Sequence, residues 1–345
     1  MNKKVEILNI LINILGIERD RAKWYVDNIL NDNNLRYVEI DNKIASSLIK
    51  ASYQMDFHQT TIPVDYISCV ATVPNMQGLG LMQGLIKDVI LESRESGVPF
   101  IAIIPKSRPI YFTYDRMGFA TVFYVNEDRF TAKHNFDVGN YFQVSPDYNS
   151  FSRLEAMRMG NIYHTQKSYF DEISAISISR GGVVAVNDGS NSEAMAFVEV
   201  DNEIKIKDVL STDSSAKEAV LYFIRDIYGE KPMVVWDMPD GEPVKMRDRG
   251  MIRVANVDSV MELIAKVNPD LNIKIGVKDE FIPLNSGKFN IARGKATRIA
   301  NNERNVSLDL ELTIDVLAKI LFSEKRIGEL FKIKTMRPYI SLMID

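Results

Sequence analysis

The chain opens with hydrophobic residues at helical spacing and then changes to strand-like alternation. In residues 3–31 the apolar positions recur every three or four residues and stop before the breaker Asn-Asp-Asn-Asn at 31–34, which predicts two helices. Three stretches with strand character follow, over residues 35–42, 43–55 and 64–73. We therefore expect two helices followed by a meander of strands.

A helix, a buried strand and a closing unit come next. Apolar residues return at helical spacing after a stretch that contains glycines, and Gly97 ends this pattern. The helical positions are Met82, Leu85, Ile86, Val89 and Ile90. The almost wholly apolar run at 100–105 is typical of a strand covered on both faces. A short helix and a strand over 108–125 complete a compact α/β domain, predicted for residues 1–130.

The middle block, residues 131–250, shows the same order of elements. We expect a helix over 151–170, strands over 176–186, 194–200 and 203–208, a helix over 214–228 and a strand over 233–238. This is the order of the first block without its glycines, so one interpretation is a degenerate internal duplicate. The other is coincidence, because this order is common in α/β folds.

The last block, residues 251–345, has a different pattern that predicts an α+β domain. We expect a helix capped by Asp258, a strand over 271–277, a hairpin over 282–291 with its turn at 285–287, a strand over 306–312, and a helix over 314–322 capped by Thr313. The full prediction is three domains, at 1–130, 131–250 and 251–345.

Composition narrows the classes of function. With 345 residues, 46% of them hydrophobic, the chain has enough apolar surface for several cores. Its single cysteine, Cys69, excludes a disulfide within the chain, and no Cys/His cluster has the spacing of a zinc site, so we expect no metal. A net charge of -4 gives no basic face for nucleic acid. No apolar run is long enough to span a membrane, and we expect a cytoplasmic protein.

The glycine stretch CVATVPNMQGLGLMQGL, residues 69–85, carries the candidate chemistry. A helix beginning near Gly80 presents unbonded backbone N–H groups and its positive dipole end, which together form an anion site; a plain strand-to-helix turn is the alternative. A Walker loop is excluded, because Gln83 stands where its second glycine belongs. A dinucleotide fingerprint is disfavoured, because Gly84 is one place late and the expected downstream acid is missing.

A third pattern fits these residues better. The stretch just described, followed by FIAIIPKSRPIYFTYDRMGFATV at 100–122, resembles the GNAT superfamily of coenzyme A-dependent N-acetyltransferases. Within it, the enhanced-intracellular-survival (Eis) family has an acetyltransferase domain, a second degenerate one and a sterol-carrier-protein-like domain. That order is similar to the three blocks of this chain. The resemblance implies the corresponding folds: a GNAT domain, a degenerate GNAT-like domain and a sterol-carrier-protein-like α+β domain.

The resemblance also implies where acetyl-coenzyme A binds. The pantetheine arm is expected beside the strand before the loop, and the pyrophosphate on the backbone N–H groups of the loop. The implied residues are Val70, Ala71, Thr72, Gln77, Gly78, Leu79, Gly80, Leu81, Met82 and Gln83. A backbone N–H of residues 70–72 is expected to stabilise the oxyanion.

Two further residues are implied as catalytic. The family uses a tyrosine four residues before a Gly-Phe pair as the acid, which is Tyr114 here; Tyr111, or two core aromatics without a role, are the alternatives. A phenol with a pKa of about 10 is a competent acid toward a thiolate whose conjugate acid has a pKa of about 8.5. The base is expected to be a carboxylate of Asp345, main-chain or side-chain. The apolar run before it predicts a buried end, with a surface strand as the alternative.

The implied function is an acetyl-coenzyme A-dependent N-acetyltransferase that acts on a primary amine by direct transfer in a ternary complex. The acceptor would be a small-molecule or peptide amine, such as an aminoglycoside, a polyamine or a lysine. Family members form hexamers, so a homo-oligomer is expected. The alternative is a non-catalytic protein that binds a lipid or another hydrophobic ligand and carries a degenerate acetyltransferase domain.

Overall fold

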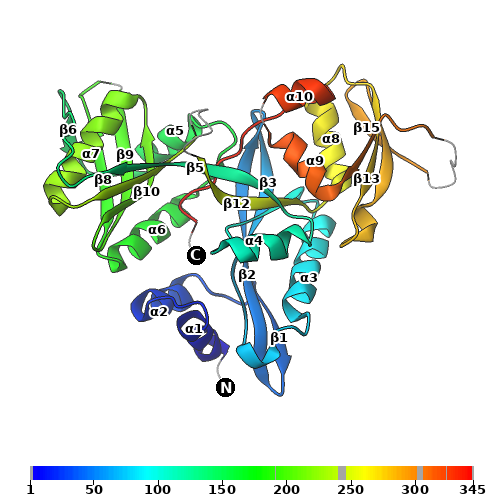
Figure 1. Ribbon diagram of the computed structural model, residues 1–345, viewed down its shortest axis with the longest axis horizontal. Helices are drawn as coiled ribbons and strands as arrows, with labels where there is room; N and C mark the ends of the chain where they lie inside the picture. Colours follow the sequence, from blue (N-terminus) through cyan, green and yellow to red (C-terminus); the bar gives the residue numbers. More distant parts are fainter. Residues whose placement is uncertain (1–2, 191, 240–245, 301–305, 324, 344–345) are drawn as a thin grey trace. The chain divides into compact units, whose positions relative to one another are not determined.

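The computed structural model describes residues 3–190, 192–239, 246–300, 306–323 and 325–343 (Figure 1). The chain forms two compact units that are each assembled from separate segments. The first comprises Met1–Ile17, Leu30–Phe123 and Arg249–Pro338, and the second comprises Glu18–Ile29, Tyr124–Asp248 and Tyr339–Asp345. Strands β5 (Ala120–Phe130) and β12 (Met246–Val254) belong to both units.

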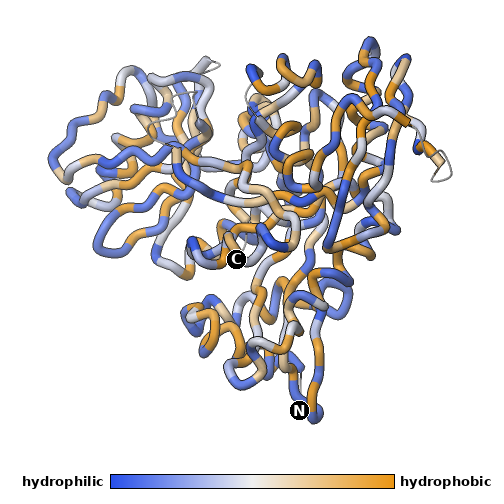
Figure 2. The backbone as a smooth tube through the Cα atoms, turned by 45° about the vertical axis from the view of Figure 1, so that its right-hand side comes forward, coloured by the Kyte–Doolittle hydropathy of each residue, from blue (hydrophilic) through white to orange (hydrophobic). Residues whose placement is uncertain are grey.

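The first unit begins with the predicted helix and meander. Its elements up to residue 115 are α1 (Lys3–Asn13), β1 (Leu35–Ile40), β2 (Lys43–Phe57), β3 (Thr60–Thr72), the short 3-10 helix η1 (Pro74–Met76), α3 (Leu81–Glu95), β4 (Phe100–Ile103) and α4 (Arg108–Asp115). The first three strands are antiparallel, β4 is parallel to β3, and β12 is antiparallel to β4. Figure 2 shows hydrophobic and hydrophilic residues interspersed along the backbone, whereas β4 has the sequence FIAI and is buried throughout.

Helix α3 forms where its apolar spacing predicts it. Leu85, Ile86, Val89 and Ile90 are all buried, and they pack with Leu48, Ile67 and Ile101 of the sheet in one hydrophobic cluster. Only one face of the helix is apolar, so this burial fixes how the helix lies on the strands. The helix ends at Glu95, just before Gly97, whose φ of +73° is the left-handed conformation that stops many helices.

The second unit repeats this topology. Its elements are α2 (Arg19–Asn28), β6 (Phe142–Val144), α5 (Tyr148–Ala156), β7 (Ile162–Tyr163), α6 (Gln166–Ile178), β8 (Gly182–Asn187), β9 (Glu193–Val200), β10 (Ile204–Ser211), α7 (Ser214–Tyr228) and β11 (Met233–Asp237). Strands β8, β9 and β10 form an antiparallel meander, α7 follows, and β11 returns parallel to β10. The order β1-β2-β3-α3-β4 of the first unit is the same, so the middle block has the topology of a second, degenerate copy.

The strands β8, β9 and β10 of the second unit are covered by helices on both faces. Val184, Val186 and other alternate strand residues pack against α7, whereas their neighbours, such as Ala185 and Met195, pack against α5 and α6. Since successive side chains of a strand point to opposite faces, α7 covers one face of the sheet and α5 and α6 cover the other. Strands β8, β9 and β10 are therefore buried on both sides, which explains their largely apolar character.

The expectation of one helix over 151–170 and a strand over 176–186 is wrong. The structure has two helices, α5 and α6, and β8 begins only at Gly182. The helical conformation is interrupted between them, where Gly160 has a φ of +73°. Thr165 then caps α6 by accepting a hydrogen bond from the Ser168 N–H. The apolar periodicity continues across this break, and for this reason spacing alone did not reveal it.

The last part of the first unit is the predicted α+β arrangement. Its elements are α8 (Val257–Val267), β13 (Ile273–Lys278), η3 (Pro283–Asn285), β14 (Gly287–Ala292), β15 (Lys295–Ile299), β16 (Leu310–Thr313), α9 (Ile314–Leu321) and α10 (Lys325–Phe331). The strands form a sheet in the order β15-β14-β13-β16. The buried guanidinium of Arg253 in β12 joins this sheet to the rest of the unit by donating to both carboxylate oxygens of Asp279, at 2.9 and 2.8 Å.

Two local expectations in this region are wrong. The hairpin lies between β14 and β15, with Arg293 and Gly294 at its turn in left-handed conformations, and not at 285–287, where a 3-10 turn leads into β14. The cap of α8 is Asn256, which accepts from the Ser259 N–H. Asp258 is the second residue of the helix and instead pairs with Arg298 at 2.8 Å. Both errors arise because adjacent Asn, Asp, Ser and Gly residues suit several neighbouring positions equally well.

Candidate active site

The two glycines of the loop are required by its backbone. Gly78 has a φ of +80° and Gly80 a φ of +78°, in the left-handed region that disfavours other residues. A Cβ atom added at Gly78 would meet nothing within 4 Å, and one at Gly80 would meet only Oε1 of Gln83, at 3.5 Å. The glycines therefore serve the conformation of the loop and leave open space above it.

The loop presents the N-terminus of α3 to solvent. The first helical hydrogen bond runs from the Gly84 N–H to the Gly80 carbonyl at 2.9 Å, so the N–H groups of residues 81–83 precede it. The first turn carries no acidic residue and Gly80 offers no capping side chain. Gln77 joins the loop to the preceding strand by donating from Nε2 to the Thr72 carbonyl at 3.2 Å. These features form an anion site made of main-chain groups.

In the second unit the corresponding helix is α7, and its N-terminus is capped by a side chain of the protein itself. Its N-cap, Asp213, accepts from the Ala216 N–H at 2.9 Å, and hydrogen bonds from Ser192 and neighbouring groups hold the pKa of its carboxyl below the ordinary value. A carboxylate already occupies the place that an anion would take. The middle block therefore lacks the anion site of the first copy.

Strand β3 leaves its neighbour just before the loop. Its pairing with β4 extends from Val64 to Ile67, and a bulge follows at Cys69, whose φ is +50°. The Val73 N–H donates to the Ala45 carbonyl of β2 at 2.9 Å, so by alternation the Thr72 N–H faces the side from which β4 has ended. Residues 70–72 thus lie beyond the end of the β3–β4 pairing, with a backbone donor on the side that β4 leaves, which we call the opening of the sheet.

Tyr114 lies in the same hydrophobic cluster as Val70 and Met82. Its side chain is 3% exposed and packs edge-on against Phe119, with ring centroids 5.5 Å apart. Burial raises the pKa of the Tyr114 phenol above its ordinary value of 10. The phenol therefore stays protonated at neutral and mildly alkaline pH. Tyr111 is partly buried against the same cluster, so packing alone does not distinguish the two tyrosines.

Gly118 fixes the turn that carries Tyr114. Its φ is +79°, and a Cβ atom at this position would lie 2.6 Å from Cγ2 of Ile314. The Tyr114 carbonyl accepts from the N–H groups of Met117 and Phe119 across this turn, at 2.9 and 3.2 Å. The Gly-Phe pair after the tyrosine thus reflects both a left-handed backbone and a close contact.

The sequence before Asp345 is buried in the second unit. Tyr339, Ile340, Ser341, Leu342 and Met343 are each 0–3% exposed. Asp345 itself lies outside the described residues. The structure therefore shows how the approach to Asp345 is held, and the role of Asp345 stays a prediction.

Sequence reasoning missed the polar residues that hold this segment. In the second unit Asp208, His164 and Glu155 are buried and Arg158 is nearly so, and these four residues contact residues 339–342 directly or through one another. No local motif marks them, because their partners lie more than 130 positions away in the chain. His58 does not belong to the site: it occupies the turn between β2 and β3, at the opposite end of β3 from the loop.

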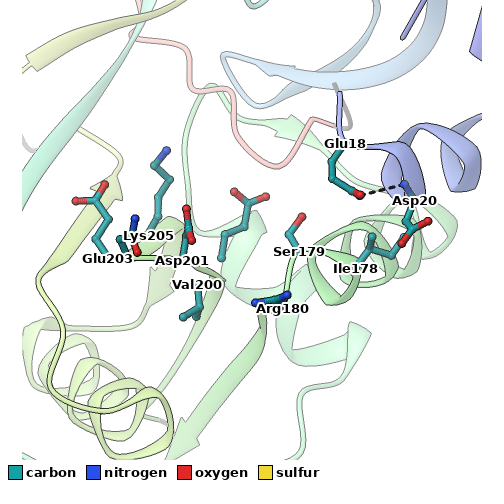
Figure 3. A pocket seen from close by; sticks show the side chains of 11 residues that line it. Glu18, Asp20, Ile178, Ser179, Arg180, Val200, Asp201, Glu203 and Lys205 are labelled. Carbon is teal, nitrogen blue, oxygen red and sulfur yellow. Dashed lines mark hydrogen bonds between the residues drawn. The ribbon is translucent and has the colours of Figure 1, made fainter. Parts of the chain in front are cut away.

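A separate pocket of about 870 Å³ lies in the second unit (Figure 3). Its lining is rich in carboxylates, and none of it comes from the residues predicted to bind the cofactor. Part of this charge is engaged in local structure. Glu18 caps α2 by accepting from the Asp20 N–H, the dashed line in Figure 3, and Glu199 pairs with Arg21 at 3.2 Å.

Neither a group of metal-binding side chains nor a membrane-spanning helix occurs among the described residues. No three His, Cys, Asp or Glu side chains among them are grouped so that they could hold a metal ion. No helix in the described part of the chain is both long and apolar enough to cross a membrane.

Comparison with known families identifies the front of the chain. A model of the GNAT acetyltransferase domain family matches residues 4–122, a range that contains the glycine loop, the bulged strand and Tyr114. Residues 4–122 are a GNAT acetyltransferase domain. A second family model, of a sterol carrier protein domain, matches residues 260–338 of this acetyltransferase. The predicted GNAT domain and sterol-carrier-protein-like domain are confirmed.

Solved structures share the fold over the whole length of the acetyltransferase. A GCN5-related N-acetyltransferase from Anabaena variabilis has a TM-score of 0.75 at 16% identity and covers 100% of this chain and 98% of its own. One from Kribbella flavida has a TM-score of 0.72 at 14% identity, with coverages of 100% and 98%. Eis1 from Mycobacterium abscessus has a TM-score of 0.71 at 12% identity, with coverages of 96% and 90%. No curated protein sequence matches the chain.

Proposed function

We propose that this chain transfers the acetyl group of acetyl-coenzyme A directly to a primary amine in a ternary complex. The GNAT match to residues 4–122 supports the donor. The observation that carries the proposal is the opening of the sheet at the bulge of β3, immediately beside a loop whose main-chain N–H groups are exposed. A thioester can enter such an opening alongside residues 70–72 while its pyrophosphate lies on the loop.

The residues present fit this donor. A Cβ atom at Gly78 would meet nothing within 4 Å and one at Gly80 only Oε1 of Gln83, and the N–H groups of residues 78–83 suit a pyrophosphate without help from side chains. Val70, Ala71 and Thr72 would hold the pantetheine arm by strand-like hydrogen bonds. Acetyl-coenzyme A would supply an activated carbonyl and a good leaving group, and the protein contributes orientation, hydrogen-bond donors and proton transfer.

The chemistry balances with the proposed residues. The amine nitrogen forms a bond to the thioester carbonyl carbon, and the carbon–sulfur bond breaks. Asp345 accepts the proton that the amine loses, and the Tyr114 phenol donates a proton to the departing thiolate. The Thr72 N–H, which faces the opening, stabilises the oxygen that becomes negative. Net transfer is one acetyl group from sulfur to nitrogen and one proton from nitrogen to sulfur.

Asp345 as the base is supported by the burial of the residues before it. Either of its carboxylates would serve. Deleting Asp345, or extending the chain by a few residues after it, should lower turnover strongly and leave coenzyme A affinity intact. A fully active extended protein would remove Asp345 from the mechanism.

The acceptor class is tested with the purified protein. Release of free thiol from acetyl-coenzyme A is followed with an aminoglycoside, a polyamine and a lysine peptide, and coenzyme A binding is measured by calorimetry. We expect release with at least one amine. No release with any amine, together with no coenzyme A binding, would overturn the proposal in favour of a hydrophobic-ligand binder. The resemblance to the Eis family extends the proposal to a cytoplasmic homo-oligomer, which analytical sedimentation would test.

A further inference from the structure

Residues 339–343, which we call the tail segment, lie in the second unit as a buried strand-like peptide. The Tyr339 N–H donates to the Gly160 carbonyl at 3.0 Å, and the Ile162 N–H donates to the Tyr339 carbonyl at 3.2 Å. These two bonds place Tyr339 beside the break between α5 and α6. The tail segment is therefore positioned by a part of the chain whose backbone is already irregular.

Asp208 anchors the first half of the tail segment. Its carboxylate is fully buried and accepts from the Tyr339 hydroxyl at 3.1 Å and from the Ser341 hydroxyl at 2.7 Å. Arg158 neutralises it with two hydrogen bonds of 2.7 and 3.0 Å, and the same guanidinium lies over the Tyr339 ring. A buried carboxylate with this many partners holds them in one geometry.

His164 anchors the second half. Its Nδ1 lies 2.6 Å from Oε1 of Glu155, and its Nε2 lies 3.1 Å from the Leu342 carbonyl oxygen. The other oxygen of Glu155 accepts from the His164 backbone N–H at 3.0 Å. Since a carboxylate and a carbonyl both accept, the ring donates from both nitrogens, as an imidazolium does. Leu342 has a φ of +51°, so the chain turns at the residue that His164 holds.

We propose that His164 is a positioning residue, which fixes the turn at Leu342, three residues before Asp345. This inference rests on the proposed function in one respect, the role of Asp345 as the base. A chain extends at most about 3.6 Å per residue, so the three residues from Leu342 to Asp345 reach about 11 Å. Asp345 is thus tied closely to the residue that His164 holds, and releasing Leu342 would remove this hold.

Two carboxylates near His164 favour its protonated form. Glu155 comes from α5, and Glu172 faces the ring from α6; Glu172 is itself paired with Lys207 of β10 at 2.7 Å. These carboxylates raise the pKa of His164 despite its burial. From the tail segment, the carbonyl of Leu342 contacts the ring. Raising the pH should therefore remove the proton and weaken the hold on Leu342.

A matched pair of substitutions separates the two contacts of the ring. The amide of asparagine reaches the position of Nδ1, whereas that of glutamine reaches the position of Nε2. His164→Asn should keep the hydrogen bond to Glu155 and lose the one to the Leu342 carbonyl. His164→Gln should keep a hydrogen-bond donor to the Leu342 carbonyl. Tyr148→Phe is the control, because the Tyr148 hydroxyl bonds the His164 carbonyl at 3.2 Å and belongs to neither anchor of the tail segment.

Two readouts test the proposal. Hydrogen–deuterium exchange of the amides of the tail segment reports how firmly it is held, and steady-state acetyl transfer reports its effect. For His164→Asn we expect exchange in the tail segment to be at least tenfold faster and kcat to fall at least tenfold, with coenzyme A affinity unchanged. For His164→Gln and Tyr148→Phe we expect values close to those of the wild type. Unchanged exchange in His164→Asn, or faster exchange with unchanged kcat, would overturn the positioning role.

A measurement on the unaltered protein covers the case in which a substitution prevents folding. Tail-segment exchange, corrected for the intrinsic effect of pH, should accelerate between pH 6 and 9 more than exchange in β9 does. Equal acceleration in both segments would overturn the proposal. If the wild type transfers no acetyl group to any amine, the proposed function fails, and the exchange comparison still decides whether His164 holds the tail segment.

Discussion

Tyr114 is the residue at which packing and chemistry are most closely linked. Tyr114→Phe retains the ring in its cluster and removes only the hydroxyl, so we expect normal folding and nearly normal coenzyme A affinity. Loss of a general acid typically costs about 10²- to 10⁴-fold in rate. Steady-state kinetics and calorimetry measure these two quantities, and unchanged turnover would assign the acid elsewhere.

Tyr111→Phe is the matched comparison for this experiment. Tyr111 lies on the same helix and contacts the same hydrophobic cluster. If Tyr114 is the acid, removing the Tyr111 hydroxyl should change kcat little. A larger loss of kcat with Tyr111→Phe than with Tyr114→Phe would reverse the assignment.

The stability contributed by His164 should depend on pH with a definite sign. Its pKa is raised in the folded protein, so its contribution is complete below the unfolded value of about 6.5 and is lost as the pH rises through the folded value. A buried hydrogen bond to a charged group contributes about 1.5–3 kcal/mol. The free energy of unfolding should therefore differ between the wild type and His164→Asn most at pH 5.5 and least at pH 9. A difference that grows with pH would contradict this.

At the residue scale, local pattern predicts what local backbone requires. Gly78 and Gly80 were recognisable from their spacing because a loop that binds through main-chain groups needs glycine at fixed positions. Asp208 and His164 were not recognisable. Their significance comes from Tyr339, Ser341 and Leu342, and nothing in the sequence around them records that contact.

At the scale of elements, the loop and α3 offer a direct comparison of two glycines. Gly80→Ala forces an alanine into a left-handed conformation, which costs about 1–2 kcal/mol. We expect coenzyme A binding to weaken roughly tenfold, because 1.4 kcal/mol corresponds to a factor of ten. Calorimetric titration with coenzyme A measures the change.

Gly84→Ala is the control for the loop. Gly84 lies inside α3, has no left-handed φ, and has nothing within 4 Å of an added Cβ atom. Alanine is a better helix former by up to about 1 kcal/mol, so this variant should be as stable as the wild type or more so, with unchanged coenzyme A affinity. Equal loss of affinity in both variants would show that the loop conformation is not what matters.

Elements were predictable where periodicity and a stop signal agreed, and not where they disagreed. Helix α3 has both, with apolar positions on one face and Gly97 at its end. Helices α5 and α6 share a continuous apolar periodicity across Gly160, and the sequence pattern therefore joined them. The bulge in β3 was invisible, because it depends on pairing with β2 and not on the residues of β3 alone.

At the scale of the whole molecule, the buried pair of Arg253 and Asp279 is a structural requirement of the first unit. Burial lowers the pKa of Arg253 to about 10, and Asp279 is the carboxylate bonded to it. Asp279→Asn would leave the guanidinium buried without a counter-charge, which typically costs about 3–5 kcal/mol. Chemical denaturation measures this loss.

The adjacent residue provides a control of similar chemistry. Glu280 also forms an ion pair, with Lys278 at 2.6 Å, but both side chains are highly exposed. Exposed ion pairs contribute little, so Glu280→Gln should leave the denaturation midpoint unchanged. A comparable loss in the two variants would mean that charge near this turn, and not burial, determines stability.

The anchoring of the tail segment also constrains how the protein is made. Asp208 is bonded to Tyr339, which lies 131 positions later in the chain. A ribosome adds about 5–20 residues per second, so the segment around Asp208 leaves it roughly 7 to 26 seconds before its partners do. During that interval Asp208 has Arg158 but neither hydroxyl. Most of the second unit is therefore synthesised well before residues 339–343, which complete its buried hydrogen bonds. A nascent chain stalled before residue 339 would carry a second unit without these residues.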